Sequence, residues 1–389
     1  MKYITQFSGE HLYLWWSRMA AMTGKELLQL GRDTLLVVAV LYLFTLDIMM
    51  AGGVKMDLNQ GTVIVHDADH SMASRELIYR FQPPYFKLGG EILDQKEGVQ
   101  LLDQGKALVV LDIPPKFQHD LLQGVQTSVQ VQVDTSNTIL GTLAASYSAQ
   151  IIGQYSFDVA LQRIGITGEN QADVPMLIDR HRVWYNPNQK DEWFMSISEL
   201  LTVITVLAMM LPAAAAVREK ERGTIEQLIV SPLTPVQILL PKVIAMTLVI
   251  LLGTALSVGL VLYGFFHVPI KGSLSLFFAV TALYTFTMSG LGLFISTMSR
   301  NLAQAAMLTI MIMMPIILLS GAWTPPEAMP PGIRQAMYLS PLYYFIEMAY
   351  GILLKGAGLK ILWDSLLGLI LLGSLVFGFG VWRFRRQFG

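Results

Sequence analysis

Six long apolar runs dominate the pattern of hydrophobic and polar positions along the chain. Each run has no charge through its middle and approaches the ~20 residues with which an α-helix crosses a bilayer. The runs cover residues 34–51, 195–217, 242–266, 273–295, 303–322 and 361–382. One such run is compatible with a buried helix of a water-soluble protein, but six are not. The pattern predicts an α-helical polytopic membrane protein with six transmembrane helices.

The segment 52–194, between the first two runs, has the composition of a water-soluble domain. Short β-type runs alternate with helical patterns in it, which favours a mixed α/β domain. The predicted strands are residues 62–66, 107–111 and 128–133, and the predicted helices are residues 71–81, 117–123 and 137–163. With about 140 residues, this segment is large enough to bury a core of its own.

Four polar residues crowd the end of the first predicted strand: His66, Asp67, Asp69 and His70. Such a cluster is compatible with a metal site. Aspartate, however, also stabilises the turns that close strands, and we prefer this second interpretation. We expect no bound metal.

The distribution of Lys and Arg predicts the orientation in the membrane. If the N-terminus is cytoplasmic, the short cytoplasmic segments contain twelve basic residues, from Lys2 to Arg386, while the opposite short loops contain four, Lys271, Arg334, Lys355 and Lys360. Because basic residues prefer the cytoplasmic side, both termini are expected there, and residues 52–194 are expected outside.

The composition of the chain excludes several classes of protein and of binding site. The chain is 53% hydrophobic and 14% charged, carries a net charge of −1 and has no cysteine. Average domains carry about 25% charged residues, so a disordered chain, a nucleic-acid-binding domain and an ordinary soluble enzyme are excluded. Disulfides and cysteine-ligated metals are excluded as well. No GxxxxGK[ST] phosphate loop occurs, so any energy for transport must come from another chain or from an ion gradient.

Residues 1–33 precede the first span and contain an amphipathic helical pattern. Trp15, Trp16 and Arg18 are followed by a charged and leucine-rich run from Lys25 to Asp33. Apolar and charged positions fall on different sides at helical spacing, which predicts an interfacial helix that leads into the first span.

The loop at 218–241, after the second span, carries the densest charge cluster of the chain, Arg218-Glu-Lys-Glu-Arg222. Thr224 is placed to cap a short helix over residues 225–230, with Glu226 in its first turn. Ser231-Pro232 ends that helix, and Thr234-Pro235 starts the next. From these residues alone, a docking element for a partner and an ordinary charged loop both remain open.

The run from Arg218 to Leu228, followed by Ser231-Pro232, resembles the signature of the type-2 ABC exporter permeases. The order of elements resembles this family over nearly the whole chain. Two short motifs, Ser320-Gly321 and the run from Ser340 to Tyr344, also resemble it. The nearest likeness is to multidrug-exporter-like permeases of the bacterial inner membrane with a large periplasmic domain.

The resemblance implies a permease subunit that exports a small hydrophobic or amphiphilic substrate, drug-like or lipid-like. A separate ATP-binding cassette subunit would hold ATP and Mg and hydrolyse the ATP, so this chain would bind no cofactor and would not be an enzyme. A second permease copy or close paralogue, a periplasmic membrane-fusion adaptor and membrane lipids would be its other partners; nucleic acid would not. The chain would be a multi-pass protein of the bacterial inner membrane.

The resemblance also assigns residues. The coupling helix, docked on the ATP-binding subunit, would contain Arg218, Glu219, Glu221, Arg222, Gly223, Thr224, Glu226 and Gln227. The connecting helix would present Lys25, Glu26, Arg32 and Asp33 to the same subunit. Residues 323–358 would form re-entrant helices on the periplasmic side, and their many prolines favour the same interpretation.

Several polar residues lie near the predicted outer ends of the spans. The candidates for the outer end of a translocation path are Asp47, Glu199, Tyr343, Tyr344 and Glu347. Simple placement at the membrane interface is the alternative for the acidic residues. Two other functions stay open: a membrane-anchored sensor or scaffold whose outer domain binds a ligand or adaptor, and an ion-coupled transporter. The second is disfavoured because ionisable residues are missing from the middle of the spans.

Overall fold

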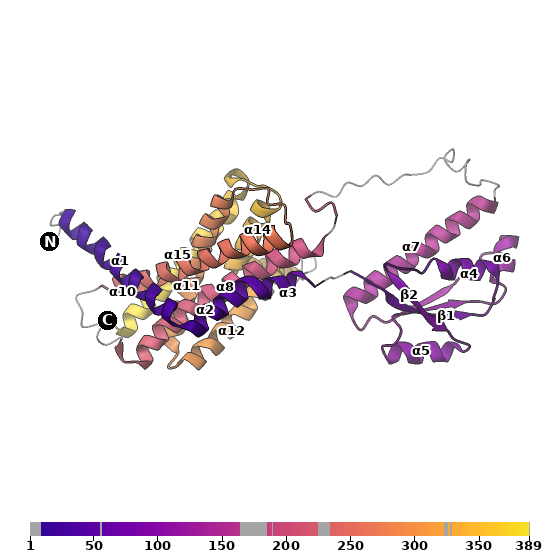
Figure 1. Ribbon diagram of the computed structural model, residues 1–389, viewed down its shortest axis with the longest axis horizontal. Coiled ribbons are helices and arrows are strands. Elements are labelled where there is room, and N and C mark those ends of the chain that lie inside the picture. Colours follow the sequence, from indigo (N-terminus) through magenta and orange to yellow (C-terminus); the bar gives the residue numbers. More distant parts are fainter. Residues whose placement is uncertain are drawn as a thin grey trace. The chain divides into compact units, whose positions relative to one another are not determined.

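The chain folds into two compact units, which are described separately. The computed structural model describes residues 9–54, 57–163, 185–188, 190–224, 234–322, 326 and 329–388 (Figure 1). The helical unit combines residues 1–54 with residues 182–389, and the sheet unit comprises residues 55–181.

The sheet unit is a four-stranded sheet with helices on both faces. Its elements in chain order are β1 (Gly61–Asp67), α4 (Met72–Tyr79), β2 (Phe86–Glu91), α5 (Gln95–Asp103), β3 (Val109–Ile113), α6 (Phe117–Gln123), β4 (Gln130–Val133) and α7 (Thr138–Arg163). The strand order is β2-β1-β3-β4, with β1 parallel to both neighbours and β4 antiparallel to β3. The sequence predicts this mixed α/β composition but not β2 and α5.

Side chains alternate between the two faces of this sheet along each strand, and different helices pack against the two faces. Val63 and Leu111 point to the face where they pack with buried residues of α4, α6 and α7. Their neighbours Ile64 and Val110 point to the other face and pack against residues of α5. Figure 1 shows α5 lying against the sheet on the opposite side from α4 and α7.

The polar cluster at the end of β1 closes a turn. Asp67 accepts hydrogen bonds from the backbone N–H groups of Asp69 and His70 at 3.0 Å each and from the Ser74 hydroxyl at 2.6 Å. His66 Nδ1 lies 2.7 Å from Asp112 on β3. Within the described residues no three metal-ligating side chains come together. These groups therefore stabilise the strand end and the capped start of α4.

The helical unit contains the apolar helices of the chain. Its elements are α1 (Gly9–Arg32), α2 (Thr34–Tyr42), the π-helix η1 (Leu43–Asp47), α3 (Ile48–Gly52), α8 (Asp191–Glu221), α10 (Pro235–Leu256), the π-helix η3 (Ser257–Phe265), α11 (Leu274–Met298), α12 (Leu302–Leu318), α13 (Pro331–Ala336), the 3-10 turn η5 (Met337–Leu339), α14 (Pro341–Leu353) and α15 (Leu359–Phe388). The unit is a polytopic helical membrane domain.

Five helical stretches in the described part of the chain are long and apolar enough to cross a membrane. They are Thr34–Gly52, Asp191–Glu221, Val236–Phe265, Leu274–Met298 and Leu359–Arg383. The run predicted as a span at 303–322 forms the shorter α12, which has 17 residues and ends three residues after its internal Pro315. A helix of that length rises about 25 Å, slightly less than the ~30 Å hydrocarbon core of a bilayer.

Two of these stretches change from α- to π-helix at the point where they meet. Phe44, in η1, is fully buried, and its ring occupies the place where a side chain on Gly253 of α10 would lie. The hydroxyl of Ser257, at the start of η3, donates to the backbone carbonyl of Phe44. That carbonyl lies in the wider turn of the π-helix, so the hydroxyl gives it a partner inside the apolar core.

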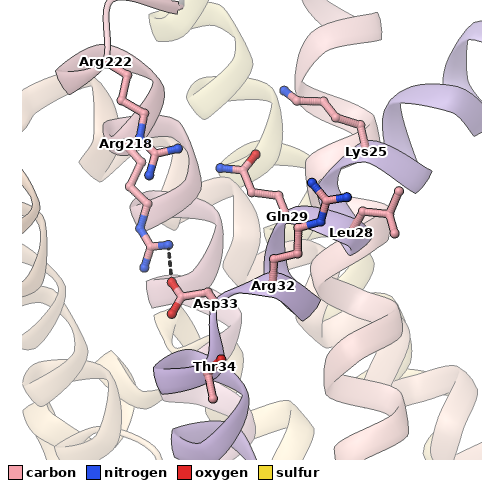
Figure 2. A pocket seen from close by; sticks show the side chains of 8 residues that line it. All are labelled: Lys25, Leu28, Gln29, Arg32, Asp33, Thr34, Arg218 and Arg222. Carbon is pink, nitrogen blue, oxygen red and sulfur yellow. Dashed lines mark hydrogen bonds and ion pairs between the residues drawn. The ribbon is translucent and has the colours of Figure 1, made fainter.

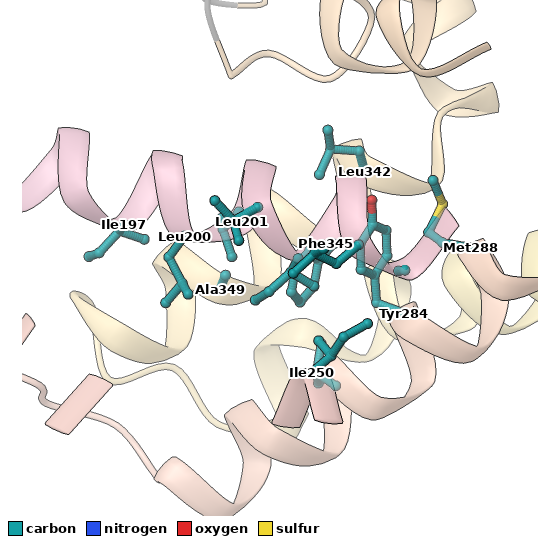
Figure 3. Packing of buried hydrophobic residues seen from close by; sticks show 14 of the residues in the cluster. Ile197, Leu200, Leu201, Ile250, Tyr284, Met288, Leu342, Phe345 and Ala349 are labelled. Carbon is teal, nitrogen blue, oxygen red and sulfur yellow. The ribbon is translucent and has the colours of Figure 1, made fainter. Parts of the chain in front are cut away.

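The core of the helical unit surrounds α11, which packs against α8, α10, α12, α14 and α15. Tyr284 of α11 is fully buried and stacks on Phe345 of α14, with ring centroids 4.1 Å apart and planes 8° from parallel (Figure 3). The Tyr284 hydroxyl lies 2.8 Å from that of Thr205 on α8, so its polar end is satisfied.

Helices α11 and α15 approach each other at glycine. A side-chain carbon on Gly380 would lie 2.5 Å from the carbonyl oxygen of Gly290, and one on Gly290 would lie 2.7 Å from the backbone of Phe377. In a membrane, where the hydrophobic effect does not drive helices together, such close backbone packing is a main source of association.

The proline-rich segment after α12 folds into α13, η5 and α14. Of the predicted re-entrant region 323–358, residues 323–325, 327 and 328 lie outside the described residues. The Ser340 hydroxyl donates to the carbonyl of Ile316 on α12 at 3.0 Å, and the Tyr350 hydroxyl donates to that of Phe194 on α8 at 3.1 Å. Short helices in this region are thus tied to the long ones.

Candidate functional site

Four consecutive charged residues end α8, and each of them binds a different part of the helical unit. They are Arg218, Glu219, Lys220 and Glu221, at the start of the cluster that stands out in the sequence. Together with their partners Lys25, Glu26, Asp33 and Lys242, we call them the charged hub. The hub gathers the ends of α1, α2, α10, α11 and α12 around the end of α8.

Arg218 binds the junction between α1 and α2. Its guanidinium lies 2.6 Å from the carboxylate of Asp33, which also caps α2 by accepting from the backbone N–H of Leu36 at 3.2 Å (Figure 2). The hydrogen bond from Arg218 and the cap from Leu36 hold the pKa of Asp33 below its ordinary value of 3.8. Asp33 is therefore charged at neutral pH and fixes the corner where the amphipathic helix turns into the first span.

Glu219 belongs to a group of four charges, three of which are buried. Lys242 of α10 is 1% exposed and lies 2.6 Å from Glu219 and 2.7 Å from Glu26 of α1. Lys25 lies 3.0 Å from Glu219 and 3.3 Å from Glu26. Two cations and two carboxylates thus balance in a site where an unpaired charge would be costly.

The half-exposed Lys25 closes this group on its open side. Burial on its own would lower the pKa of the Lys25 ammonium, but the carboxylates of Glu219 and Glu26 outweigh burial and raise it. Lys25 consequently remains protonated at every physiological pH, and the four charges stay balanced.

Lys220 and Glu221 bind the connection between α11 and α12. The Lys220 ammonium donates to the carbonyls of Ser296 at 2.6 Å and Ser299 at 3.2 Å, at the end of α11. The Glu221 carboxylate accepts from the backbone N–H of Leu302, the first residue of α12, at 2.9 Å. A cation thus meets the negative end of one helix dipole and an anion the positive end of the next.

The predicted coupling residues therefore divide into two groups. Arg218, Glu219 and Glu221 are bonded within the chain, while Arg222 is exposed just beyond α8. Gly223 takes a positive φ of 67° and ends the helix, and the Thr224 hydroxyl donates to the carbonyl of Glu219 at 3.2 Å. Two further predicted coupling residues, Glu226 and Gln227, and the predicted helix at 225–230, lie outside the described residues.

The predicted connecting residues divide in the same way. Lys25, Glu26 and Asp33 belong to the charged hub, and Glu26 is 2% exposed. Arg32 is exposed at the end of α1 and faces the pocket that Figure 2 shows. The structure brings the predicted coupling residues and the predicted connecting residues together, because Arg218 binds Asp33 and Glu219 binds Lys25.

Two hub residues, Lys220 and Lys242, were not among the predicted site residues. Lys220 was recognised only as a member of the charge cluster and as a positive charge that sets the orientation, and Lys242 only as such a positive charge. Lys242 follows Pro241 at the start of an almost uninterrupted apolar run. A lone lysine in such a run needs a buried partner, and this was the available signal. The sequence did not identify the partner, since Glu26 lies 216 residues away.

The predicted outer residues form two groups at the other end of the unit. The carboxyl groups of Asp47 and Glu199 interact with each other. Tyr343 and Tyr344 pack edge to face, and Glu347 lies close to both while it accepts from the Ser365 hydroxyl at 2.7 Å. In the residues that the structure describes, no hydrogen bond joins the acidic pair to the tyrosines.

Known proteins resemble this chain over nearly its whole length. The profile described as "ABC-2 family transporter protein" matches residues 34–382. The inner membrane transport permease YhhJ of Escherichia coli K12 is 34% identical over 367 residues, 94% of this chain and 96% of YhhJ. The probable multidrug ABC transporter permease YbhR of the same organism is 28% identical over 375 residues, 95% of this chain and 99% of YbhR. The matched residues include the four charges that end α8.

Proposed function

The chain belongs to the ABC-2 family of transporter proteins, and from that premise we propose that it is the permease subunit of an ATP-driven exporter in a bacterial inner membrane. ABC-2 permeases work with an ATP-binding cassette subunit. In this proposal, that separate subunit binds ATP with Mg and hydrolyses the ATP. Two permease copies, or this chain and a close paralogue, form the path.

The observation that carries the proposal is that the four charged residues at the end of α8 bind different parts of the helical unit. Arg218 binds the corner of α1 and α2, and Glu219 binds Lys25 of α1 and Lys242 of α10. Lys220 binds the end of α11, and Glu221 binds the start of α12. The residues that follow are the ones proposed to contact the ATP-binding subunit. A push on that loop therefore reaches the ends of α1, α10, α11 and α12 through direct side-chain contacts of 2.6–2.9 Å.

The proposed topology has six spans, with α12 as the fifth, and with both termini and the charged hub in the cytoplasm. The sheet unit then lies in the periplasm, where it docks an adaptor or its counterpart in a dimer, and α13 and α14 form the re-entrant segment. The excess of Lys and Arg at the hub end supports this orientation. The absence of cysteine from the sequence makes it directly testable.

Single cysteines report the topology. Arg222→Cys lies at the hub end, and Lys355→Cys follows α14 at the opposite end of the unit. A membrane-impermeant maleimide applied to spheroplasts is expected to label Lys355→Cys at once and Arg222→Cys only after lysis. Labelling of Arg222→Cys before lysis would refute the orientation.

The substrate is proposed to be small and hydrophobic or amphiphilic. The methionines of α12, such as Met311 and Met314, are exposed on the helical unit and adapt to varied shapes. Both relatives named above are permeases, and one carries a multidrug name. Asp47, Glu199, Tyr343, Tyr344 and Glu347 remain the candidates for the outer end of the path.

Transmission through the hub is tested by Glu221→Ala, which removes the contact with α12. We expect the ATP-binding subunit to co-purify as with the unaltered chain, while the stimulation of its ATPase activity by the permease falls several-fold. Glu192→Ala, at the other end of α8, is the matched control and should leave stimulation unchanged. Equal stimulation in the two variants would rule out the proposed transmission, and loss of co-purification would make Glu221 a docking residue.

A further inference from the structure

A basic pocket lies beside the junction of α1 and α2. It has a volume of about 730 Å³, and its charged lining residues are Lys25, Arg32, Asp33, Arg218 and Arg222. Figure 2 shows Arg218, near the end of α8, and Arg222, just beyond it, across the pocket from Gln29 and Arg32 of α1. Four cations against one carboxylate make the pocket attractive to an anion.

The cations of the pocket differ in their acidic partners. Lys25 pairs with Glu219 and Arg218 pairs with Asp33. Among the described residues, no carboxylate lies within ion-pair distance of Arg32 or Arg222. Two exposed guanidinium groups are thus available to hold one phosphate by charge-assisted hydrogen bonds.

An apolar slot opens from the same place. A cavity of about 300 Å³ shares Asp33 and Arg218 with the basic pocket and is otherwise lined by uncharged residues of α2, η1, α8 and α12, among them Leu35, Leu43 and Ala306. The rise from Leu35 to Leu43 is about 12 Å, close to the ~15 Å of one leaflet of the hydrocarbon core.

The level of the pocket fits a membrane surface. Tyr13 and Trp16 on α1 are 73% and 60% exposed, as expected of aromatic side chains that lie among lipid headgroups. The first stretch long enough to span a membrane begins at Thr34, which lines the pocket. The basic pocket thus lies at headgroup depth, and the slot leads from it into the hydrocarbon.

We propose that the basic pocket and the slot together bind one anionic phospholipid. The phosphate lies between Arg32 and Arg222, and one acyl chain fills the slot between α2, α8 and α12. A zwitterionic lipid such as phosphatidylcholine brings the same phosphate together with a quaternary ammonium, which the four cations of the pocket repel, and a free phosphate would leave the slot empty. Basic pockets between transmembrane helices are a known way to hold acidic headgroups.

Bound there, the lipid would brace the corner between α1, the first span and the hub. Arg222 also borders the loop proposed to contact the ATP-binding subunit, so lipid binding is measured on the permease alone, without ATP or that subunit, and its failure is distinguishable from failure of the proposed function. Failure of one proposal leaves the other standing.

The test measures phosphatidylglycerol bound to the purified full chain in detergent by native mass spectrometry, with phosphatidylcholine and glycerol 3-phosphate as the comparison probes. We expect the unaltered chain to prefer phosphatidylglycerol and the double variant Arg32→Gln/Arg222→Gln to bind it at least tenfold more weakly. Arg32→Lys/Arg222→Lys keeps both charges and should stay within about threefold of the unaltered chain. Ala306→Phe, which fills the slot, should also weaken binding.

The matched control Lys355→Gln/Lys360→Gln removes two exposed cations from the other end of the unit and should leave binding unchanged. Equal binding of phosphatidylglycerol by the Arg→Gln double variant and the unaltered chain would overturn the proposal, as would equal binding of phosphatidylcholine. Displacement by glycerol 3-phosphate at equal concentration would indicate a site for free phosphate. Absence of lipid binding together with loss of the ATP-binding subunit from the double variant would make the pocket a protein interface.

Discussion

At the scale of single residues, Lys242 determines whether the centre of the hub is neutral. It is buried and contacts both buried carboxylates, whereas Lys25 reaches the same carboxylates from the surface. A buried ion pair adds little stability compared with an apolar replacement, but removal of one partner leaves a charge without compensation. The hub is therefore intolerant of single substitutions.

Lys242→Met should destabilise the protein strongly. The variant keeps the length and apolar stem of the side chain but leaves Glu26 and Glu219 with Lys25 alone, and such losses cost about 3–5 kcal/mol. Thermal unfolding of the purified chain, followed by intrinsic fluorescence, measures the effect. Lys360→Met, at an exposed position, should change little, and similar melting temperatures for the two variants would contradict the prediction.

Asp33 gives the hub a pH dependence at its outer edge. Because its pKa is lowered below 3.8, the contact with Arg218 contributes stability fully above that pH and loses it as the pH falls through the lowered value. Asp33→Asn keeps the cap of α2 but removes the charge. The difference in melting temperature between the two proteins should be constant from pH 7 to about pH 4 and narrow below. A difference that vanishes by pH 6 would contradict this.

The residues of the hub were easier to predict than its contacts. The charge cluster Arg218–Arg222 and the charges of α1 stand out in the sequence. Their interpretation as a surface for a partner missed that most of them bind one another. Glu219 and Lys25 are 194 positions apart, and the packing of α1 and α8 against α10 brings them together. No periodicity within one segment contains that information.

At the scale of elements, the contact between α11 and α15 depends on the absence of a side chain at Gly380. Gly380→Val should push the helices apart, since its first side-chain carbon would lie 2.5 Å from the backbone oxygen of Gly290. Overpacking of this kind costs about 1–3 kcal/mol. Gly378→Val is the control on the same helix, because a side chain there meets nothing within 4 Å. Equal thermal stability of the two variants would show that the helices adjust freely.

The long apolar runs predicted the long helices better than the alternation of polar and apolar residues predicted the strands of the sheet unit. The strand β2 has two glycines in six residues and five exposed positions, so it lacks the alternation that identifies strands. It exists because β1 offers it an edge to pair with. The helix α4 lies within the predicted helix at 71–81, and Ser71 caps it by accepting from the backbone N–H of Ser74.

At the scale of the whole molecule, the chain consists of two units with separate cores, and the sheet unit should fold without the other. The isolated segment 57–163 is expected to be soluble and to unfold in one cooperative transition. Leu111→Ala, at a fully buried position of β3, should lower its free energy of unfolding in urea by about 2–5 kcal/mol. Leu122→Ala, 74% exposed, should change it by much less. An isolated segment without a cooperative transition would refute the independence of its core.

The separate contacts made by the charges at the end of α8 also have a consequence for genetics. Because the charges at the end of α8 have different partners, substitutions there damage separate contacts, and their suppressors should map to separate places. Revertants of a defective Arg218 variant would arise at the corner of α1 and α2, and those of a Glu219 variant at Lys25 or Lys242. Revertants of a Glu221 variant would arise at the start of α12. A selection for restored transport would thereby identify the contacts of the hub from the sequences of the revertants alone.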